Sequence, residues 1–218
     1  MSDYNKPIIV ISKCLGFDNC KHDGSIENNE FIEKLKKYVK VIPICPEIEC
    51  GLQIHHSKLR IVENNNKEEL LIPNEDLNLT QEMHDFSNKF LNKLTNVDGF
   101  ILKSKSPICA LKDAKVYDTL EKGCAIKREH GFFTKEIIKQ YPYIPIEDEH
   151  RLNNFKIREH FLSRIFILSD FRLIKKSFNF ESLKSFHLKN TLLFLSYSQK
   201  YSKLLDNLIY SDKIEDIN

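Results

Sequence analysis

The chain has 218 residues, of which 41% are hydrophobic and 29% are charged, with a formal net charge of +2. This is the composition of a soluble globular protein long enough for one large domain or two small ones, and the charge gives no case for a globally basic nucleic-acid-binding protein. The first residues are polar, and every apolar run is much shorter than the roughly 20 residues of a membrane span. We therefore expect a cytoplasmic protein.

Six cysteines are present. In the cytoplasm they are not expected to form a disulfide framework. Metal ligation or redox chemistry is the expected use of these thiols, and buried inert cysteines are the alternative.

Strands and helices alternate in the first half of the chain. Apolar runs predict buried strands over Pro7–Lys13, Val39–Ile44 and Val97–Leu102. Amphipathic helices are predicted over Glu27–Tyr38 and Thr80–Leu94. The first strand, helix and strand follow one another as in a right-handed βαβ unit, which pairs its strands in parallel.

The intervening segments are less regular. Cys45–Val62 is predicted to be a long connection, and the charged, Asn-rich Glu63–Glu69 an exposed loop or hairpin tip. Helices are predicted over Ala110–Lys122 and Phe132–Tyr141.

After Pro142 and Pro145 only helical spacing of Phe, Leu and Ile remains, which predicts helices over Arg151–Phe166, Phe180–Tyr197 and Lys200–Ile209. The fold class is therefore predicted to be α/β. A small parallel-sheet Rossmann-like domain with helices on both faces (residues 1–141) is followed by an all-α domain (142–218). Residues 151–203 hold 11 Lys and Arg against 3 Asp and Glu, so this part is locally basic.

Three predicted strands each lead to a cysteine, namely Cys14, Cys45 and Cys109. The carboxyl ends of parallel strands meet along one edge of a sheet, so these thiols are expected to lie close together. Iron–sulfur clusters usually have four cysteine ligands, and a cluster with three would keep one iron open, as catalytic zinc sites keep one position open. Spacing alone leaves a metal or cluster site and buried inert thiols as equal alternatives.

Several phrases resemble the thiouracil desulfidase family, formerly a bacterial domain of unknown function. They are ISKCLG at Ile11–Gly16, CPE at Cys45–Glu47, CGL at Cys50–Leu52 and LKSKSPICA at Leu102–Ala110. Tyr143–Phe166 resembles the YbgA-like domain often fused behind it, here in a C-terminally truncated form.

This resemblance implies an oxygen-sensitive 4Fe-4S cluster bound by Cys14, Cys45 and Cys109, with one open iron. It implies removal of sulfur from 4-thiouracil-type pyrimidines, as the base, the nucleoside or in tRNA. C=S would become C=O with release of hydrosulfide and without net redox change, which makes the enzyme hydrolase-like. Glu47 and Ser106 match residues of the family's presumed active site.

The chemistry suits these residues. A soft thiocarbonyl sulfur fits thiolate-ligated iron, which would polarise the C=S bond. Glu47 would take a proton from the attacking water, a general-base contribution of about 10²–10⁴ in rate. Ser106 would pass a proton to the ring or hold the intermediate. Asp23 matches the family's DG turn, which implies that it forms a wall of the substrate pocket. Lys103 is expected either to contact a phosphate of the substrate or to be a solvated charge.

Other interpretations of single residues stay open. Cys20 or Cys50 would close the open iron if either were a fourth ligand. The adjacent His55 and His56 are predicted to line a loop, because neighbouring side chains of an extended segment point to opposite faces.

The chain also departs from the family pattern. It has SPICA where SPSCG is usual, through Ile108 and Ala110, and His55-His56 where relatives commonly have Pro-Arg. These changes leave two alternative functions open: a non-catalytic RNA- or partner-binding protein that keeps the fold, and a zinc-site or sulfur-carrier protein. The basic residues 151–203 would be the RNA contact, and the protein would be a monomer or a dimer.

Overall fold

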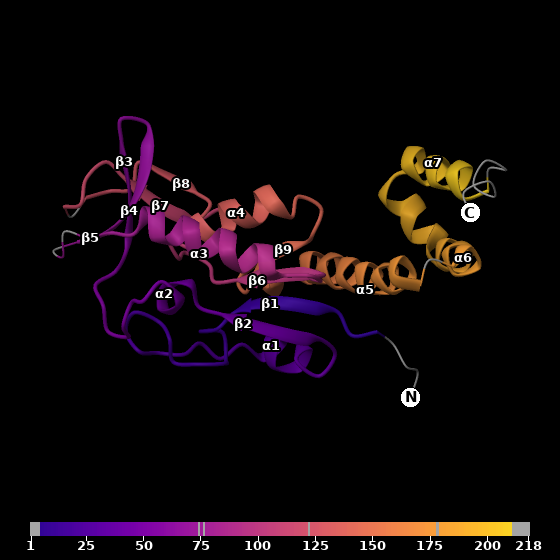
Figure 1. Cartoon of the computed structure of the whole chain (residues 1–218), viewed down its shortest axis with the longest axis horizontal. Coiled ribbons are helices and arrows are strands. Elements are labelled where there is room, and N and C mark those ends of the chain that lie inside the picture. The colour runs from indigo at the N-terminus through magenta and orange to yellow at the C-terminus, as the bar shows by residue number, and fades with distance from the viewer. Residues whose placement is uncertain (1–4, 74, 76, 122, 178, 211–218) are drawn as a thin grey trace. The chain divides into compact units, whose positions relative to one another are not determined.

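The computed structural model describes residues 5–210 except 74, 76, 122 and 178. Its contacts divide the chain into two units, Lys6–Phe166 and a second of residues 1–5 and 167–218. The first is an α/β unit with a parallel sheet, and the second is helical (Figure 1). This confirms the predicted fold class.

A four-stranded parallel sheet organises the α/β unit. Its strand order is β2-β1-β6-β9, and each neighbouring pair is parallel. The strands are β1 (Ile8–Ser12), β2 (Lys40–Ile44), β6 (Gly99–Leu102) and β9 (Ile146–Asp148). The first three confirm the strands predicted from the apolar runs.

Helices cover both faces of this sheet because β1, one of its two central strands, is apolar from Ile8 to Ile11. In β1, Val10 packs into one core, whereas Ile9 and Ile11 pack into the other, as the two-residue period of a strand requires. On the Val10 side lie α3 (Thr80–Lys93) and α4 (Phe132–Gln140); α1 (Glu30–Leu35) and the start of α5 (Phe155–Ser177) pack on the opposite side. Figure 1 shows α3 and α4 on one face of this sheet and α1 on the other.

A second, mixed sheet joins the same unit, and the sequence did not predict it. Its order is β5-β4-β3-β7-β8. The strands are β3 (Arg60–Asn64), β4 (Lys67–Ile72), β5 (Leu77–Asn78), β7 (Ala114–Tyr117) and β8 (Lys127–Glu129). The predicted hairpin tip is confirmed: Asn65 and Asn66 form the β3–β4 turn with φ of 49° and 61°, which asparagine tolerates.

The helix predicted over Ala110–Lys122 is wrong, because β7 occupies this segment. Ala114 and Val116 are fully buried while Lys115 is exposed, which is the alternation of a half-buried strand. Four residues are too few to separate that alternation from helical spacing.

Residues 142–166, assigned from the sequence to the helical piece, pack within the α/β unit. β9 pairs with β6, and Leu152 and Phe161 lie in the core on the α1 side. The short 3-10 helix Arg151–Asn153 connects β9 to α5.

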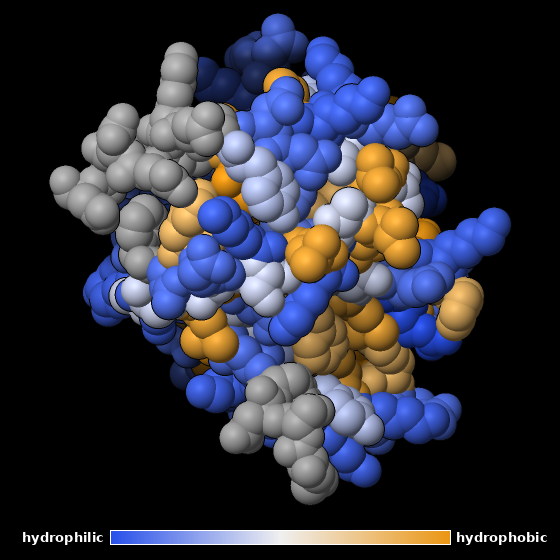
Figure 2. Space-filling model, turned by 90° about the vertical axis from the view of Figure 1, so that its right-hand side faces the viewer, coloured by the Kyte–Doolittle hydropathy of each residue, from blue (hydrophilic) through white to orange (hydrophobic). Residues whose placement is uncertain are grey.

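The helical unit contains the last part of α5 together with α6 (Phe180–Tyr197) and α7 (Gln199–Ile209). Asn179 and Ser198 cap the two later helices by accepting backbone N–H groups, which stabilises helix starts. Apolar side chains remain exposed on them, and hydrophobic patches are visible in Figure 2; exposed residues include Leu188, Leu192, Tyr201, Leu204 and Leu208. Within the described residues, no helix has the length and apolarity needed to cross a membrane.

Candidate functional site

A cavity of about 450 Å³ lies at the carboxyl ends of β1, β2 and β6. Ser12 and Ile44 end two of these strands, and Ser104 follows the third; all three line the cavity. Its outer wall comes from the second sheet, through Arg60 and Tyr117 among others. This is the edge at which open α/β sheets bind ligands, and the volume is that of a small-molecule site.

The structure brings Cys14, Cys45 and Cys109 to this cavity, each no more than 8% exposed. Cys14 sits in the turn after β1, and Cys45 is the N-cap of α2 (Pro46–Glu49). Cys109 lies in the turn after β6. Three loops that are distant in the sequence thus present one thiol each to the same space.

The surroundings of Cys45 and Cys109 favour their neutral thiols. Burial raises the pKa of Cys109, and contact with Cys20 followed by burial raises the pKa of Cys45. Thiolates there need a compensating positive charge, which metal ions supply. Within the described residues, no group of three or more His, Cys, Asp or Glu side chains is arranged around a single metal ion. Soft thiols spread around a buried cavity fit an iron–sulfur cluster, whose cysteine ligands bind different irons.

Cys20 is a fourth thiol in the lining, and it is 3% exposed. Its contacts with Cys14 raise its pKa to about 12, and its backbone carbonyl accepts the thiol of Cys45 at 3.6 Å. Cys50 does not line the cavity, and its sulfur lies 3.7 Å from the carbonyl of Glu82. Of the two cysteines considered as a fourth ligand, only Cys20 reaches the site.

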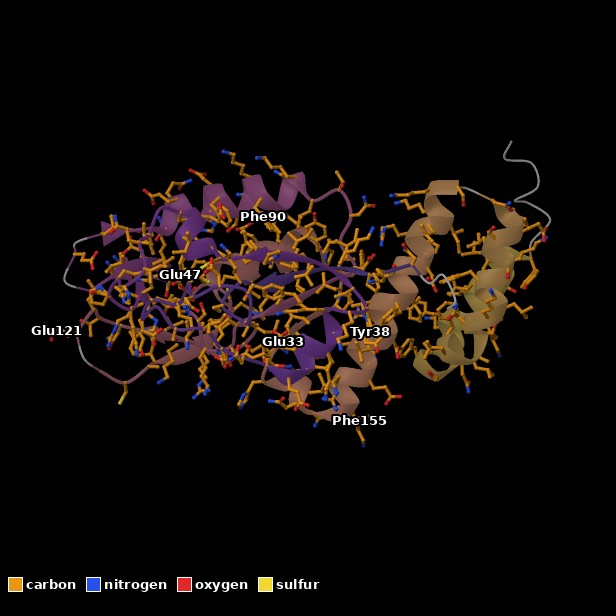
Figure 3. All side chains as sticks on the ribbon, turned by 90° about the horizontal axis from the view of Figure 1, so that it is seen from below. Glu33, Tyr38, Glu47, Phe90, Glu121 and Phe155 are labelled. Carbon is orange, nitrogen blue, oxygen red and sulfur yellow. The ribbon has the colours of Figure 1, made fainter. Side chains whose placement is uncertain are left out.

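Glu47 projects into the cavity from the first turn of α2, two residues after Cys45. Figure 3 shows Glu47 and Tyr38 toward opposite ends of the α/β unit, as expected for residues that follow and precede β2. Glu47 Oε2 lies 3.2 Å from Nε2 of His56, and both side chains are largely buried.

His56 is a residue of the site that the sequence did not identify. Its Nδ1 donates to the carbonyl of Ser57 at 2.7 Å, so Nε2 is the nitrogen that faces Glu47. The carboxylate of Glu47 raises the pKa of His56. His55 is exposed, which confirms that the adjacent side chains diverge. The departure from Pro-Arg at these positions was the one signal that pointed here.

Ser106 is held by the turn that carries Cys109. Its Oγ accepts the backbone N–H groups of Ile108 and Cys109, both at 3.1 Å. Both lone pairs of the Ser106 oxygen are then occupied, so its hydroxyl hydrogen can be donated. The Cys109 sulfur lies close enough to accept it. Ser12, at the end of the neighbouring strand β1, makes a similar contact with the Cys109 thiol. Its hydroxyl oxygen also accepts the backbone N–H of Lys103 at 2.9 Å.

The SPICA departures lie outside the cavity. Ile108 and Ala110 are fully buried in the core, and neither lines the site. Among the described non-glycine residues, positive φ occurs at His55, Asn65, Asn66 and Lys105. Ala110 therefore does not need the left-handed conformation that favours glycine.

Lys103 lines the cavity and pairs with Glu149, and with Glu27 at 3.2 Å. Burial opposes its charge, but these carboxylates outweigh burial and raise its pKa. Glu149 also accepts the backbone N–H and hydroxyl of Ser104, at 2.9 and 2.6 Å, so it holds the segment after β6.

Asp23 lies outside the cavity lining, contrary to the prediction. Its carboxylate accepts the N–H and hydroxyl of Ser25, which lowers its pKa to about 2. A local turn therefore uses this side chain.

The cavity lining is strongly basic. It contains seven lysine and arginine residues but one carboxylate, Glu47; the basic residues are Lys13, Lys21, Lys58, Arg60, Lys103, Lys105 and Lys115. Lys13 pairs with Asp18, and Lys103 pairs with Glu27 and Glu149; these three carboxylates all lie outside the lining. The remaining excess of positive charge in the lining attracts anionic ligands. The sequence had indicated a basic surplus only in residues 151–203.

Gly131 supports the turn that carries Cys109. A Cβ at this position would lie 2.3 Å from the carbonyl oxygen of Ile108 and 2.8 Å from the Cys109 nitrogen. We expect Gly131→Ala to destabilise the protein by about 1–3 kcal/mol, because two backbones must separate. Denaturant unfolding measures this. Gly123→Ala is the matched control, since its Cβ would meet nothing nearer than 4.0 Å; equal losses in the two variants would contradict the packing described.

Comparison with known proteins places these features in context. The model of a family described as 2-thiouracil desulfurase matches residues 9–149. A solved structure of the [4Fe-4S]-dependent thiouracil desulfidase TudS is similar, with a TM-score of 0.53 and 16% identity, covering 71% of this chain and 99% of that chain. At this identity the likeness shows a shared fold. A search of curated proteins gave no match.

Proposed function

Because this chain belongs to the 2-thiouracil desulfurase family, we propose that it is an iron–sulfur-dependent desulfidase of 4-thiouracil-type pyrimidines. The product would be the C=O pyrimidine and hydrosulfide, without net redox change. The supporting observation is that Cys14, Cys45 and Cys109 line one cavity with Glu47 and Ser106.

Cys14, Cys45 and Cys109 would hold a 4Fe-4S cluster. When bound, it would supply a Lewis-acidic iron that takes the soft thiocarbonyl sulfur and makes the attached ring carbon electrophilic. The buried cysteines would bind iron as thiolates, so cluster binding would release their protons.

Glu47 is the proposed general base. Its carboxylate would accept a proton from the water that attacks the ring carbon, and Nε2 of His56 lies 3.2 Å away to orient it. Ser106 would donate its hydroxyl hydrogen to the ring or to the developing anion, since its lone pairs are occupied by backbone N–H groups. Water supplies the oxygen, so the conversion is a hydrolysis.

His56→Ala is expected to lower kcat roughly tenfold, because Glu47 loses its orienting partner. Iron content should not change, since the hydrogen-bond partners of His56 are Ser57 and Glu47 rather than a cysteine. His55→Ala is the matched control, because the adjacent side chain is exposed. The measurement is kcat by steady-state kinetics on samples of equal iron content. Equal kcat values for His56→Ala and His55→Ala would show that His56 has no role in the reaction.

The basic lining supports a phosphorylated substrate, such as a 4-thiouridine nucleotide or tRNA, over the uncharged base. Lys115 belongs to β7, and Lys58 lies just before β3. Both line the cavity at the second sheet. A hydrogen bond between charged groups contributes roughly 1.5–3 kcal/mol.

Lys58→Ala is therefore expected to raise KM for phosphorylated 4-thiouridine about tenfold. KM for free 4-thiouracil should stay the same, because that substrate carries no phosphate. Lys40→Ala, at the opposite end of β2, serves as the control. A rise in KM for both substrates would argue against phosphate recognition by Lys58.

Anaerobic purification and reconstitution test the proposed function. The protein should contain iron and sulfide in equal amounts and release hydrosulfide from 4-thiouracil, 4-thiouridine or thiolated tRNA. A protein that stays iron-free, or an iron-loaded protein that releases no hydrosulfide from any of them, would overturn the proposal. Tight, salt-dependent tRNA binding without turnover would instead support the RNA-binding alternative.

A further inference from the structure

Four buried cysteines line the cavity, and the proposed function uses three of them. The remaining one is Cys20, which is 3% exposed and packs in the core cluster that also contains Cys14 and Cys45. A buried cysteine is often an inert core residue. Its surroundings here are different, because they are the other thiols of the site.

The loop between β1 and α1 folds back to place Cys20 at the cavity. Gly16 and Gly24 flank it with φ of +84° and +71°, which only glycine adopts without strain. The N–H of Glu27 donates to the carbonyl of Cys14 at 2.8 Å and so closes the loop. One closed loop therefore delivers two thiols to the site.

The contacts of Cys20 link it to two of the proposed ligands. Its thiol lies within hydrogen-bonding reach of the thiols of Cys14 and Cys45. Its carbonyl accepts the thiol of Cys45 at 3.6 Å. A residue used only for packing does not need this placement, whereas iron–sulfur clusters commonly take four cysteine ligands.

We propose that Cys20 is a fourth, exchangeable ligand of the cluster, bound when no substrate is present. The inference rests on the proposed function, since the other three thiols must hold the cluster first. On leaving the iron, the Cys20 thiolate would take up one proton and become a thiol. One iron–sulfur bond replaces another, so no electron is transferred.

This arrangement reconciles a fourth thiol with catalysis. A permanent fourth ligand would block substrate sulfur, whereas an exchangeable one covers the iron only between turnovers. Cys20 would thereby protect the cluster from loss of that iron in the resting protein.

The test compares the wild-type protein with Cys20→Ala after anaerobic reconstitution, with Cys50→Ala as the control. Cys50 is a half-buried thiol outside the cavity. Iron and sulfide contents and the thermal unfolding midpoints are measured first. All three proteins should hold equal amounts of iron and sulfide.

Electron paramagnetic resonance then reports on the fourth iron without any turnover. Added hydrosulfide should change the spectrum of the reduced cluster at a concentration about tenfold lower in Cys20→Ala, because no protein ligand has to be displaced. In air, the three-iron signal should also develop faster in this variant. Cys20→Ser should lie between the two, and Cys50→Ala should match the wild type.

Each other outcome overturns the inference in a distinguishable way. Identical hydrosulfide titrations and air conversion in the wild type and Cys20→Ala would show that Cys20 is not a ligand, while the proposed function stands. A Cys20→Ala protein that unfolds normally but loads no cluster would show an obligatory ligand rather than an exchangeable one. A wild-type protein that loads no iron would overturn both proposals.

Discussion

Cys109→Ala is expected to abolish cluster binding and turnover. Cys109 is 5% exposed and comes from the turn after β6, so no other strand end replaces its thiol. Residues that merely orient metal ligands already contribute 10–100-fold in metal affinity, and loss of a ligand should cost roughly this much or more. Iron, sulfide and hydrosulfide release should fall together to background.

Cys124→Ala is the matched control for this substitution, because Cys124 is exposed and lies outside the cavity lining. It should keep wild-type iron content and activity. Unfolding of Cys109→Ala should remain cooperative, which separates ligand loss from misfolding. An iron-loaded, active Cys109→Ala protein would contradict the assignment of this residue.

Glu47→Gln is expected to lower kcat by about 10²–10⁴ while the cluster remains. Glutamine keeps the size of the side chain and a contact to His56, but it cannot accept the proton of water. The loss should fall on kcat, with little change in KM, because a general base acts in the transition state. Steady-state kinetics on iron-quantified protein measure both.

Glu49→Gln provides the control within the same helix. Glu49 belongs to α2 but is exposed and does not line the cavity, so its removal should leave kcat unchanged. Full turnover by iron-loaded Glu47→Gln would exclude Glu47 as the base.

The sequence predicted β1, β2 and β6 from their apolar runs, and β1 and β6 are almost fully buried. It missed β9, which has only three residues. It also predicted that Cys14, Cys45 and Cys109 would meet, since parallel strands end along one edge. The structure brings all three to one cavity. Local burial patterns and one topological rule were enough for this result.

Other features depend on contacts that local patterns do not encode. His56 reaches Glu47 through a connection that turns at Gly51 and His55, both with positive φ. Asp23 was wrongly predicted to line the cavity. Its carboxylate instead accepts hydrogen bonds from the backbone N–H and hydroxyl of Ser25 within a local turn. Strand β7 of the second sheet was missed because it has only four residues.

Native mass spectrometry of the anaerobically reconstituted protein, followed by addition of 4-thiouracil, tests the central claim most directly. We predict one 4Fe-4S cluster per chain, absent from Cys14→Ala, Cys45→Ala and Cys109→Ala, and hydrosulfide release by the wild type alone among these four. A chain that carries zinc or no metal, or a cluster retained by all three variants, would contradict the account.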